Sequence, residues 1–163
     1  MDWNTQLQVI GEVALAMLLG GVIGLEREVA NKPAGFRTHM LVAGAAALLV
    51  GLGDALLQRF GAGTDTSIRS DPIRIVEAII TGISFLGAGT IFRRGKSEHV
   101  EGLTTAASIL LSSAIGISVA LRQMVLAVGA TALALITLYA LRFVEKYIDR
   151  KRDAESPRSR DRD

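Results

Sequence analysis

Cysteine is absent from this sequence of 163 residues, and histidine occurs only twice, at His39 and His99. Without cysteine the chain has neither disulfide bonds nor thiolate metal sites, and the two histidines are not spaced as metal ligands on one helix. Aromatic residues are scarce at 5%, and the formal net charge of +2 is too small to indicate a nucleic-acid partner. Disulfide scaffolds, thiolate metal sites and basic nucleic-acid binders are therefore excluded.

Apolar and small residues are abundant instead. Half of the chain is hydrophobic and 17 residues are glycine, the balance of a helical membrane protein in which small residues let helices approach closely. Five apolar stretches, at about 7–25, 38–57, 75–92, 103–121 and 124–141, are each close to the ~20 residues that a helix needs to cross a bilayer. We therefore expect an all-α membrane protein with five transmembrane helices: a domain at 1–144 in the lipid bilayer and a charged tail at 145–163. A soluble bundle is the alternative, but the fourth and fifth stretches lack the polar outward faces that it would need.

Lysine and arginine are distributed unevenly between the two predicted sides. With the N-terminus outside, the outer side holds only Arg59, Arg69, Arg74 and Arg122, whereas the inner loops and the tail hold the other basic residues. The positive-inside rule favours this orientation, which places the C-terminus in the cytoplasm. The first eleven residues are acidic, so we expect no signal peptide.

The tail interleaves basic with acidic residues. We expect the fifth helix to continue a few turns into it and the last eight or so residues to be disordered. A polybasic patch that binds lipid headgroups is the alternative, weakened by the interleaved acids.

Small residues recur every four positions in three of the predicted helices. These ladders are Ala16, Gly20 and Gly24 in the first helix, Ala43, Ala47, Gly51 and Ala55 in the second, and Thr104, Ser108, Ser112, Gly116 and Ala120 in the fourth. Residues four apart share a helix face, so each ladder forms a smooth groove for a neighbouring backbone. We expect a homo-oligomer, with a dimer as its simplest form, although the sequence does not identify the ladder that it would use.

A weak internal repeat relates the two halves of the membrane region at an offset of 67 positions. Leu19-Gly20 matches Leu86-Gly87, Arg27 matches Arg94, Gly35 matches Gly102, Thr38 matches Thr105 and Ala47 matches Ala114. The repeat aligns the first helix with the third and the second with the fourth. We interpret it as the duplication of a two-helix unit.

Three acidic residues interrupt the apolar stretches: Glu12, Asp54 and Glu77. A charge at the centre of a membrane helix costs roughly 2.5–3.5 kcal/mol on insertion scales, so such residues usually have a partner or a functional role. Together with Asp65 and Asp71 they predict an acidic vestibule on the outer side that attracts hard cations such as Mg²⁺. The alternative is that each acid pairs with an outer arginine or reaches the lipid headgroups.

On the inner side, Glu26-Arg27-Glu28 ends the first helix and Arg37 begins the second. A cation is disfavoured at a helix N-terminus, so we expect Arg37 to form a salt bridge to Glu26 or Glu28 that ties the two helices together. A binding or docking surface is the alternative for these residues. The sequence shows no nucleophile–base arrangement and no phosphate-binding loop, so we expect no enzymatic activity.

Five motifs in order resemble the MgtC/SapB family of bacterial inner-membrane proteins. They are Gly20-x-x-x-Gly24-Leu25-Glu26-Arg27-Glu28, Ala34-Gly35-Phe36-Arg37-Thr38, Asp71-Pro72-x-Arg74-Ile75, Gly82-Ile83-x-Phe85-Leu86-Gly87-Ala88-Gly89 and Gly102-Leu103-Thr104-Thr105-Ala106-Ala107. The resemblance assigns functional positions to Glu26, Arg27, Arg37, Asp71, Arg74, Thr104 and Thr105. It implies a multi-pass protein linked to magnesium homeostasis, some of whose relatives act by binding other membrane proteins.

Two departures from the family pattern bear on function. Ala78 stands beside Glu77 where a polar residue is expected, and the chain ends soon after the fifth helix, as in the shorter SapB-like members without a soluble C-terminal domain. We expect a non-enzymatic component of magnesium or ion homeostasis that acts through membrane partners, with no cofactor other than Mg²⁺. The alternative is a Mg²⁺ transporter or channel, with Glu12, Asp54, Asp71 and Glu77 as candidate cation-binding residues.

Overall fold

The computed structural model describes residues 2–60, 72–93 and 100–155. Its elements are α1 (Trp3–Val29), α2 (Phe36–Phe60), α3 (Pro72–Ala88), the short strands β1 (Phe92–Arg93) and β2 (Val100–Glu101), α4 (Leu103–Ala120) and α5 (Met124–Glu155). The prediction of an all-α protein with five helices is confirmed. Asp71, Arg94 and the last eight residues, whose disorder was predicted, lie outside the described residues.

Local hydrogen bonds explain where helices begin and end. Asp2 caps α1 because its carboxylate accepts the Thr5 backbone N–H at 3.2 Å and the Thr5 hydroxyl, and these bonds lower the pKa of Asp2. The third helix ends at Ala88 rather than at about 92, because Thr90 donates its N–H and its hydroxyl to the Gly87 carbonyl at 2.9 and 2.7 Å. Beyond that turn, Phe92 pairs with Glu101 in the antiparallel β1–β2 ladder. As predicted, α5 continues into the charged tail.

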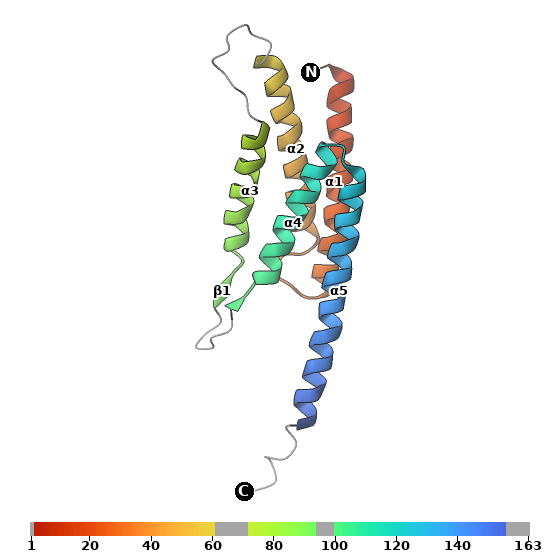
Figure 1. Cartoon of the computed structure of the whole chain (residues 1–163), viewed down its shortest axis with the longest axis vertical. Coiled ribbons are helices and arrows are strands. Elements are labelled where there is room, and N and C mark those ends of the chain that lie inside the picture. Colours follow the sequence, from red (N-terminus) through yellow and green to blue (C-terminus); the bar gives the residue numbers. More distant parts are fainter. Residues whose placement is uncertain (1, 61–71, 94–99, 156–163) are drawn as a thin grey trace.

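The helices run roughly parallel and antiparallel in one bundle, with α3 and α5 on opposite sides of α4 (Figure 1). The third helix packs against α2 and α4, and the fifth packs against α1 and α4. The main core consists of small and branched side chains from four helices: Ala16, Ile23, Ala43, Ala47, Ile115, Val119, Ala127, Ala134 and Leu138. We call the end of the bundle that carries the N-terminus the outer end, in keeping with the charge rule, and the opposite end the inner end.

The small-residue ladders of α1, α2 and α4 face one another inside a single chain. A Cβ added to Gly20 would lie 2.5 Å from the carbonyl oxygen of His39 in α2. A Cβ on Gly116 would lie 2.9 Å from the carbonyl carbon of Ala43, also in α2. Both distances are too short for real atoms, so only glycine permits these helix contacts. The ladders are therefore used by the α1–α2 and α2–α4 contacts within the chain.

The helix pairs α1–α2 and α3–α4 make a corresponding contact. Gly20 lies against His39, and Gly87 lies against Ala106, where a Cβ on the glycine would be 3.5 Å from the alanine Cβ. Each residue of the second pair stands 67 positions after its counterpart in the first, which is the offset of the sequence repeat. This agreement supports the duplication of a two-helix unit, with looser packing in the second copy.

Three helices are long and apolar enough to cross a membrane: Trp3–Val29, Phe36–Arg59 and Leu103–Ala120. The apolar part of α5, Met124–Ala140, is shorter. The outward sides of α1 and α5 expose large apolar residues, including Leu18 (63%) and Val125 (88%), as a lipid-facing surface requires. Length and composition thus support a membrane protein, and α3, with 17 residues, lies beside two of the candidate spans.

Candidate functional site

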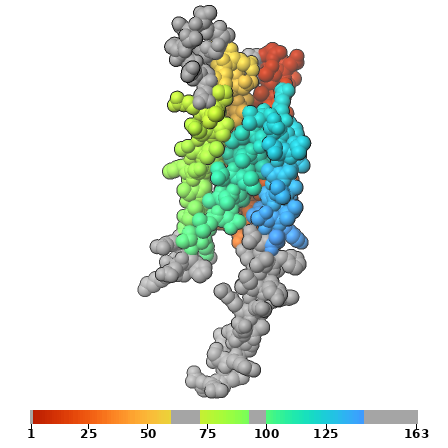
Figure 2. Space-filling model, in the orientation of Figure 1, coloured from red at the N-terminus to blue at the C-terminus, as the bar shows by residue number. Residues whose placement is uncertain are grey.

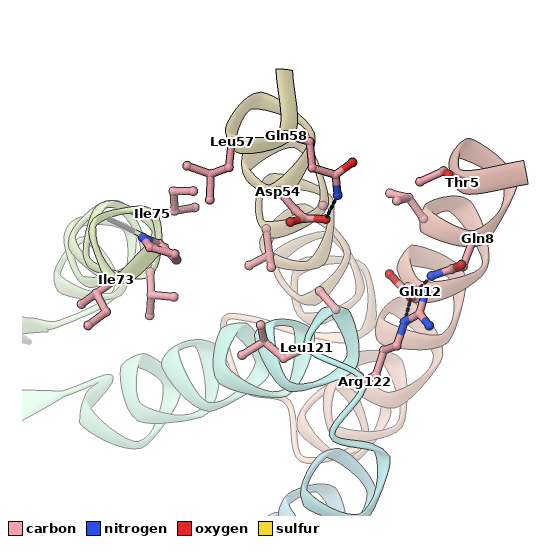
Figure 3. Close-up of a pocket in the computed structure, with 16 residues that line it drawn as sticks. Thr5, Gln8, Glu12, Asp54, Leu57, Gln58, Ile73, Ile75, Leu121 and Arg122 are labelled. Carbon is pink, nitrogen blue, oxygen red and sulfur yellow. Dashed lines mark hydrogen bonds and ion pairs between the residues drawn. The ribbon is translucent and has the colours of Figure 1, made fainter. Parts of the chain in front are cut away.

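A cavity of about 570 Å³ opens at the outer end between α1, α2, α3 and the end of α4 (Figure 3). Its polar side chains come from three of these elements: Thr5, Gln8, Glu12, Asp54, Gln58 and Arg122. The rest of the lining is mainly apolar, with Ile73, Ile75 and Val76 contributed by α3. The structure thus brings together two of the acids that were predicted to form an outer vestibule, Glu12 and Asp54.

Glu12 is held by two donors that reach the same oxygen. Gln8, one turn earlier on α1, donates its amide to Oε1 at 3.0 Å, and Arg122 donates Nε–H to Oε1 at 3.3 Å. Arg122 has a left-handed φ of 58° in the α4–α5 turn, and its side chain reaches across to α1. Because the arginine side chain is 64% exposed, solvent screens this ion pair, whose expected contribution to stability is about 0–1 kcal/mol.

Asp54 has a similar amide partner on α2. Gln58 donates its side-chain N–H to Oδ2 of Asp54 at 2.8 Å. Within the described residues no hydrogen bond reaches Oε2 of Glu12 or Oδ1 of Asp54. Each carboxylate therefore presents one oxygen to the cavity, and carboxylate and amide oxygens are the ligands that Mg²⁺ and Ca²⁺ prefer.

Glu77 is the remaining predicted vestibule residue that the structure describes. Glu77 does not line the cavity, although its neighbours Ile75 and Val76 do, because the Glu77 side chain lies on the outward side of α3. Asp65 and Asp71 lie outside the described residues. Across the described part of the chain, no group of three or more histidine, aspartate or glutamate residues is close enough to hold a metal ion directly. The structure therefore does not place Glu77 with Glu12 and Asp54 at this cavity.

A second polar cluster is buried at the inner end. Arg27 donates its Nε–H to Oε2 of Glu26 at 2.6 Å, and the two side chains are only 3% and 11% exposed. Glu28 accepts the backbone N–H of Phe36 at 2.9 Å and so caps the start of α2. Arg37 is exposed. The described partner of Glu26 is Arg27, and Glu28 caps the helix, so the salt bridge of Arg37 stays a prediction.

His39 links this cluster to α4. The ring is fully buried; its Nδ1 lies 2.9 Å from the carbonyl oxygen of Gly35, and its Nε2 lies 3.0 Å from the hydroxyl of Ser108. A carbonyl oxygen only accepts, so Nδ1 carries a proton, and in the neutral ring Nε2 accepts the Ser108 hydroxyl proton. Ser108 lies 2.8 Å from its alternative acceptor, the Thr105 carbonyl. Of the two predicted threonines, Thr105 is buried here and Thr104 is exposed.

The Ser108–His39 pair has the spacing of a nucleophile and its base, an arrangement that the sequence did not reveal. Ser108 is only 5% exposed and lies inside α4, where the neighbouring backbone N–H groups are used by the helix. An acyl-transfer site needs free donors for the developing oxyanion, and a helix interior does not provide them. We therefore interpret the pair as a structural link between α2 and α4.

This interpretation predicts the result of replacing Ser108 with alanine. The variant removes the partner of a buried ring nitrogen, so we expect it to lower the free energy of unfolding by about 1–3 kcal/mol. The matched control is Ser118→Ala in the same helix, whose hydroxyl bonds only the local Ala114 carbonyl at 2.9 Å. Denaturant unfolding followed by circular dichroism measures both. Equal stability of the two variants would contradict the structural role.

One protein family resembles this chain over most of its length. The model of the MgtC family matches residues 13–147. MgtC of Brucella abortus (strain 2308) is 39% identical over 117 residues, which cover 72% of this chain and 44% of that protein. SapB of Bacillus subtilis (strain 168) is 33% identical over 118 residues, covering 72% and 50% of the two chains. YhiD of Escherichia coli (strain K12), provisionally named a magnesium transporter, is 37% identical over 112 residues, covering 67% and 49%.

The chain thus spans about half the length of these curated relatives. No solved structure matches it.

Proposed function

The chain belongs to the MgtC family, and on that basis we propose that it is a multi-pass protein of the bacterial inner membrane that serves magnesium homeostasis by binding a divalent cation in its outer cavity. It acts without catalysis, as a regulator of other membrane proteins. The observation that carries this proposal is the pair of carboxylates at the cavity, each with one oxygen that no described residue engages. The name of the E. coli relative adds support for magnesium as the cation.

The cavity suits a cation that keeps much of its water. Mg²⁺ loses its water ligands reluctantly and is usually held by one or two carboxylates rather than by a complete protein cage. A cavity of about 570 Å³ with two carboxylates and two glutamine amides offers such a site. Arg122 already offsets part of the charge of Glu12, so we expect weak binding that responds to millimolar rather than micromolar Mg²⁺.

A packed apolar core favours regulation over transport. Between the cavity and the inner cluster lie Ala16, Ala43, Ala47, Ile115 and Val119, each at most 1% exposed. A divalent ion crossing this layer would lose its water without gaining oxygen ligands, which is very costly. The cation is therefore expected to bind from the outer side and to change the protein rather than to pass through it.

A Mg²⁺ transporter is the second candidate, and one observation favours it. The hydroxyls of Ser112 and Ser113 are fully buried in α4, and neither has a hydrogen-bond partner among the described residues. They lie along α4 between Ser108 at the inner end and Arg122 at the outer end. A second conformation that opens this helix would place hydroxyl oxygens on a path between the two polar sites.

Cation binding can be measured through the single tryptophan, Trp3, which stands near the cavity on the first turn of α1. We expect Mg²⁺ to change its fluorescence in the full chain in lipid nanodiscs, and Asp54→Asn to weaken the apparent affinity at least about tenfold. Arg122→Gln should strengthen binding, because it removes the positive charge beside Glu12. Glu101→Gln, at the inner end, is the control and should leave the titration unchanged.

The same protein in liposomes loaded with a Mg²⁺-sensitive dye separates the two candidates. Binding without flux above empty liposomes supports the regulatory proposal. Flux that Asp54→Asn abolishes supports the transporter instead. A titration that Asp54→Asn and Arg122→Gln both leave unchanged overturns the proposed cation site.

A further inference from the structure

The third helix has an outward side that no described element covers. Its buried side, which includes Ile79 and Gly87, packs toward α2 and α4. The opposite side exposes six residues at helical spacing: Arg74, Glu77, Ala78, Thr81, Phe85 and Ala88. The ring of Phe85 is 84% exposed, and α3 forms an edge of the bundle along most of its length (Figure 2).

This outward side carries a charge that no described residue neutralises. Glu77 is in the second turn of α3, which lies beside the candidate spans α2 and α4. Within the described residues its carboxylate has neither a hydrogen bond nor an ion pair, and the Thr81 hydroxyl donates only to the Glu77 backbone carbonyl, at 2.8 Å. A carboxylate that faces lipid is costly, and no described residue pairs with Glu77, so a partner from a second molecule would stabilise it.

Three other acids in the helices have partners within the chain. Glu12 is bonded by Gln8 and Arg122, Asp54 by Gln58, and Glu26 by Arg27. The exposed sides of α1 and α5 consist largely of leucine, isoleucine and valine, which lipid chains cover without further partners. The small-residue ladders are already used inside the bundle. Among the described surfaces, the outward side of α3 is therefore the one on which an additional protein partner would neutralise a charge.

We propose that this partner is a second copy of the chain, packed α3 against α3 about a two-fold axis along the membrane normal. In such a dimer the Arg74 guanidinium of each copy pairs with Glu77 of the other. The arrangement is self-complementary, as a two-fold interface must be, because one acid and one base lie on the same helix side. They are three residues apart, about 4.5 Å along the axis, a distance that an arginine side chain spans.

Small residues between the charges permit close approach. Ala78 and Thr81 lie at the centre of the outward side, and an added Cβ on neighbouring Gly82 meets nothing within 4 Å. Closely packed backbones keep lipid headgroups and water away from the charge pairs. In these less polar surroundings each ion pair is stronger. Because Glu77 does not line the outer cavity, this inference is independent of the proposed cation site.

Cysteine cross-linking tests the interface directly, since the natural chain contains no cysteine. Thr81→Cys, at the centre of the outward side, should give an oxidised dimer in reconstituted membranes. Ile80→Cys is the matched control: it has the same depth and is 43% exposed, but it lies about 100° around the helix. We expect at least about tenfold more cross-linked dimer for Thr81→Cys. Equal cross-linking of the two variants, or none for either, overturns the proposal.

Charge exchange tests the pairing. Arg74→Glu or Glu77→Arg alone places like charges across the axis and should weaken the dimer at least about tenfold, whereas the double variant should restore it. The dimer fraction is read from single-molecule photobleaching in liposomes, at several ratios of protein to lipid. If either single variant does not fold, Glu77→Gln, which removes the pair without repulsion, should weaken the dimer. If none of these substitutions changes the dimer fraction, or if the protein is monomeric at every ratio of protein to lipid, the α3 interface is refuted.

Discussion

Replacing Gly116 with alanine is expected to lower the free energy of unfolding by about 3 kcal/mol, a large fraction of the roughly 5–15 kcal/mol that stabilises an ordinary protein. The new Cβ would lie 2.9 Å from the carbonyl carbon of Ala43 and 3.1 Å from its Cα, and closer still to the carbonyl oxygen. A flexible side chain can move away from such a contact, but the backbone of α2 moves only with its helix. The α2–α4 contact would therefore separate at the centre of the main core.

The chain supplies its own control for this result. A Cβ added to Gly129 in α5 meets nothing within 4 Å. Alanine is favoured over glycine inside a helix by roughly 0.5–1 kcal/mol, so Gly129→Ala should be neutral or slightly stabilising. Unfolding in a denaturant, followed by circular dichroism, measures both variants in the same detergent. If Gly116→Ala is as stable as Gly129→Ala, the tight α2–α4 contact is contradicted.

The five helices could be predicted because each is a long apolar run. Such a run can be recognised in the sequence without knowing which helices pack against it. The end of α3 was harder, because Ile91 and Phe92 are as apolar as the helix before them. There the hydrogen bonds from Thr90 to the Gly87 carbonyl end the helix, and the pattern of apolar residues gives no sign of these bonds. The ladders predicted close helix contacts but not their partners, since a ladder defines a groove and not the helix that fills it.

The candidate site was predicted in part, and the reason lies in helix rotation. Glu12 and Asp54 were expected on the outer side, and the structure places both at one cavity. Glu77 was expected there too because it lies near the outer end of its helix, but a position along the helix does not give the direction in which the side chain points. The Ser108–His39 contact joins positions 69 apart. In the sequence, only the threonine and serine residues of the α4 ladder indicated such a contact, because buried hydroxyl groups need polar partners.

Arg27→Leu is the second change with a large expected effect. The Arg27 side chain is 3% exposed and bonds Glu26, which is 11% exposed. Removing one member of a buried ion pair leaves the other charge in a poorly solvated place, which typically costs about 3–5 kcal/mol. Arg122→Gln breaks the other ion pair, in which the arginine is 64% exposed, and should cost less than about 1 kcal/mol. Denaturant unfolding of the two variants provides the comparison.

The double variant Glu26→Gln, Arg27→Leu separates the loss of the pair from the loss of the arginine itself. If the charge of Glu26 in the absence of Arg27 causes the damage, the double variant should recover a large part of the lost stability, because neither charge of this pair remains. No recovery would show that Arg27 acts mainly by packing. Since the apolar core separates the inner cluster from the outer cavity, Arg27→Leu protein that still folds should keep its Trp3 response to Mg²⁺. A loss of that response in folded protein would contradict this separation and would mean that the two ends of the bundle are coupled.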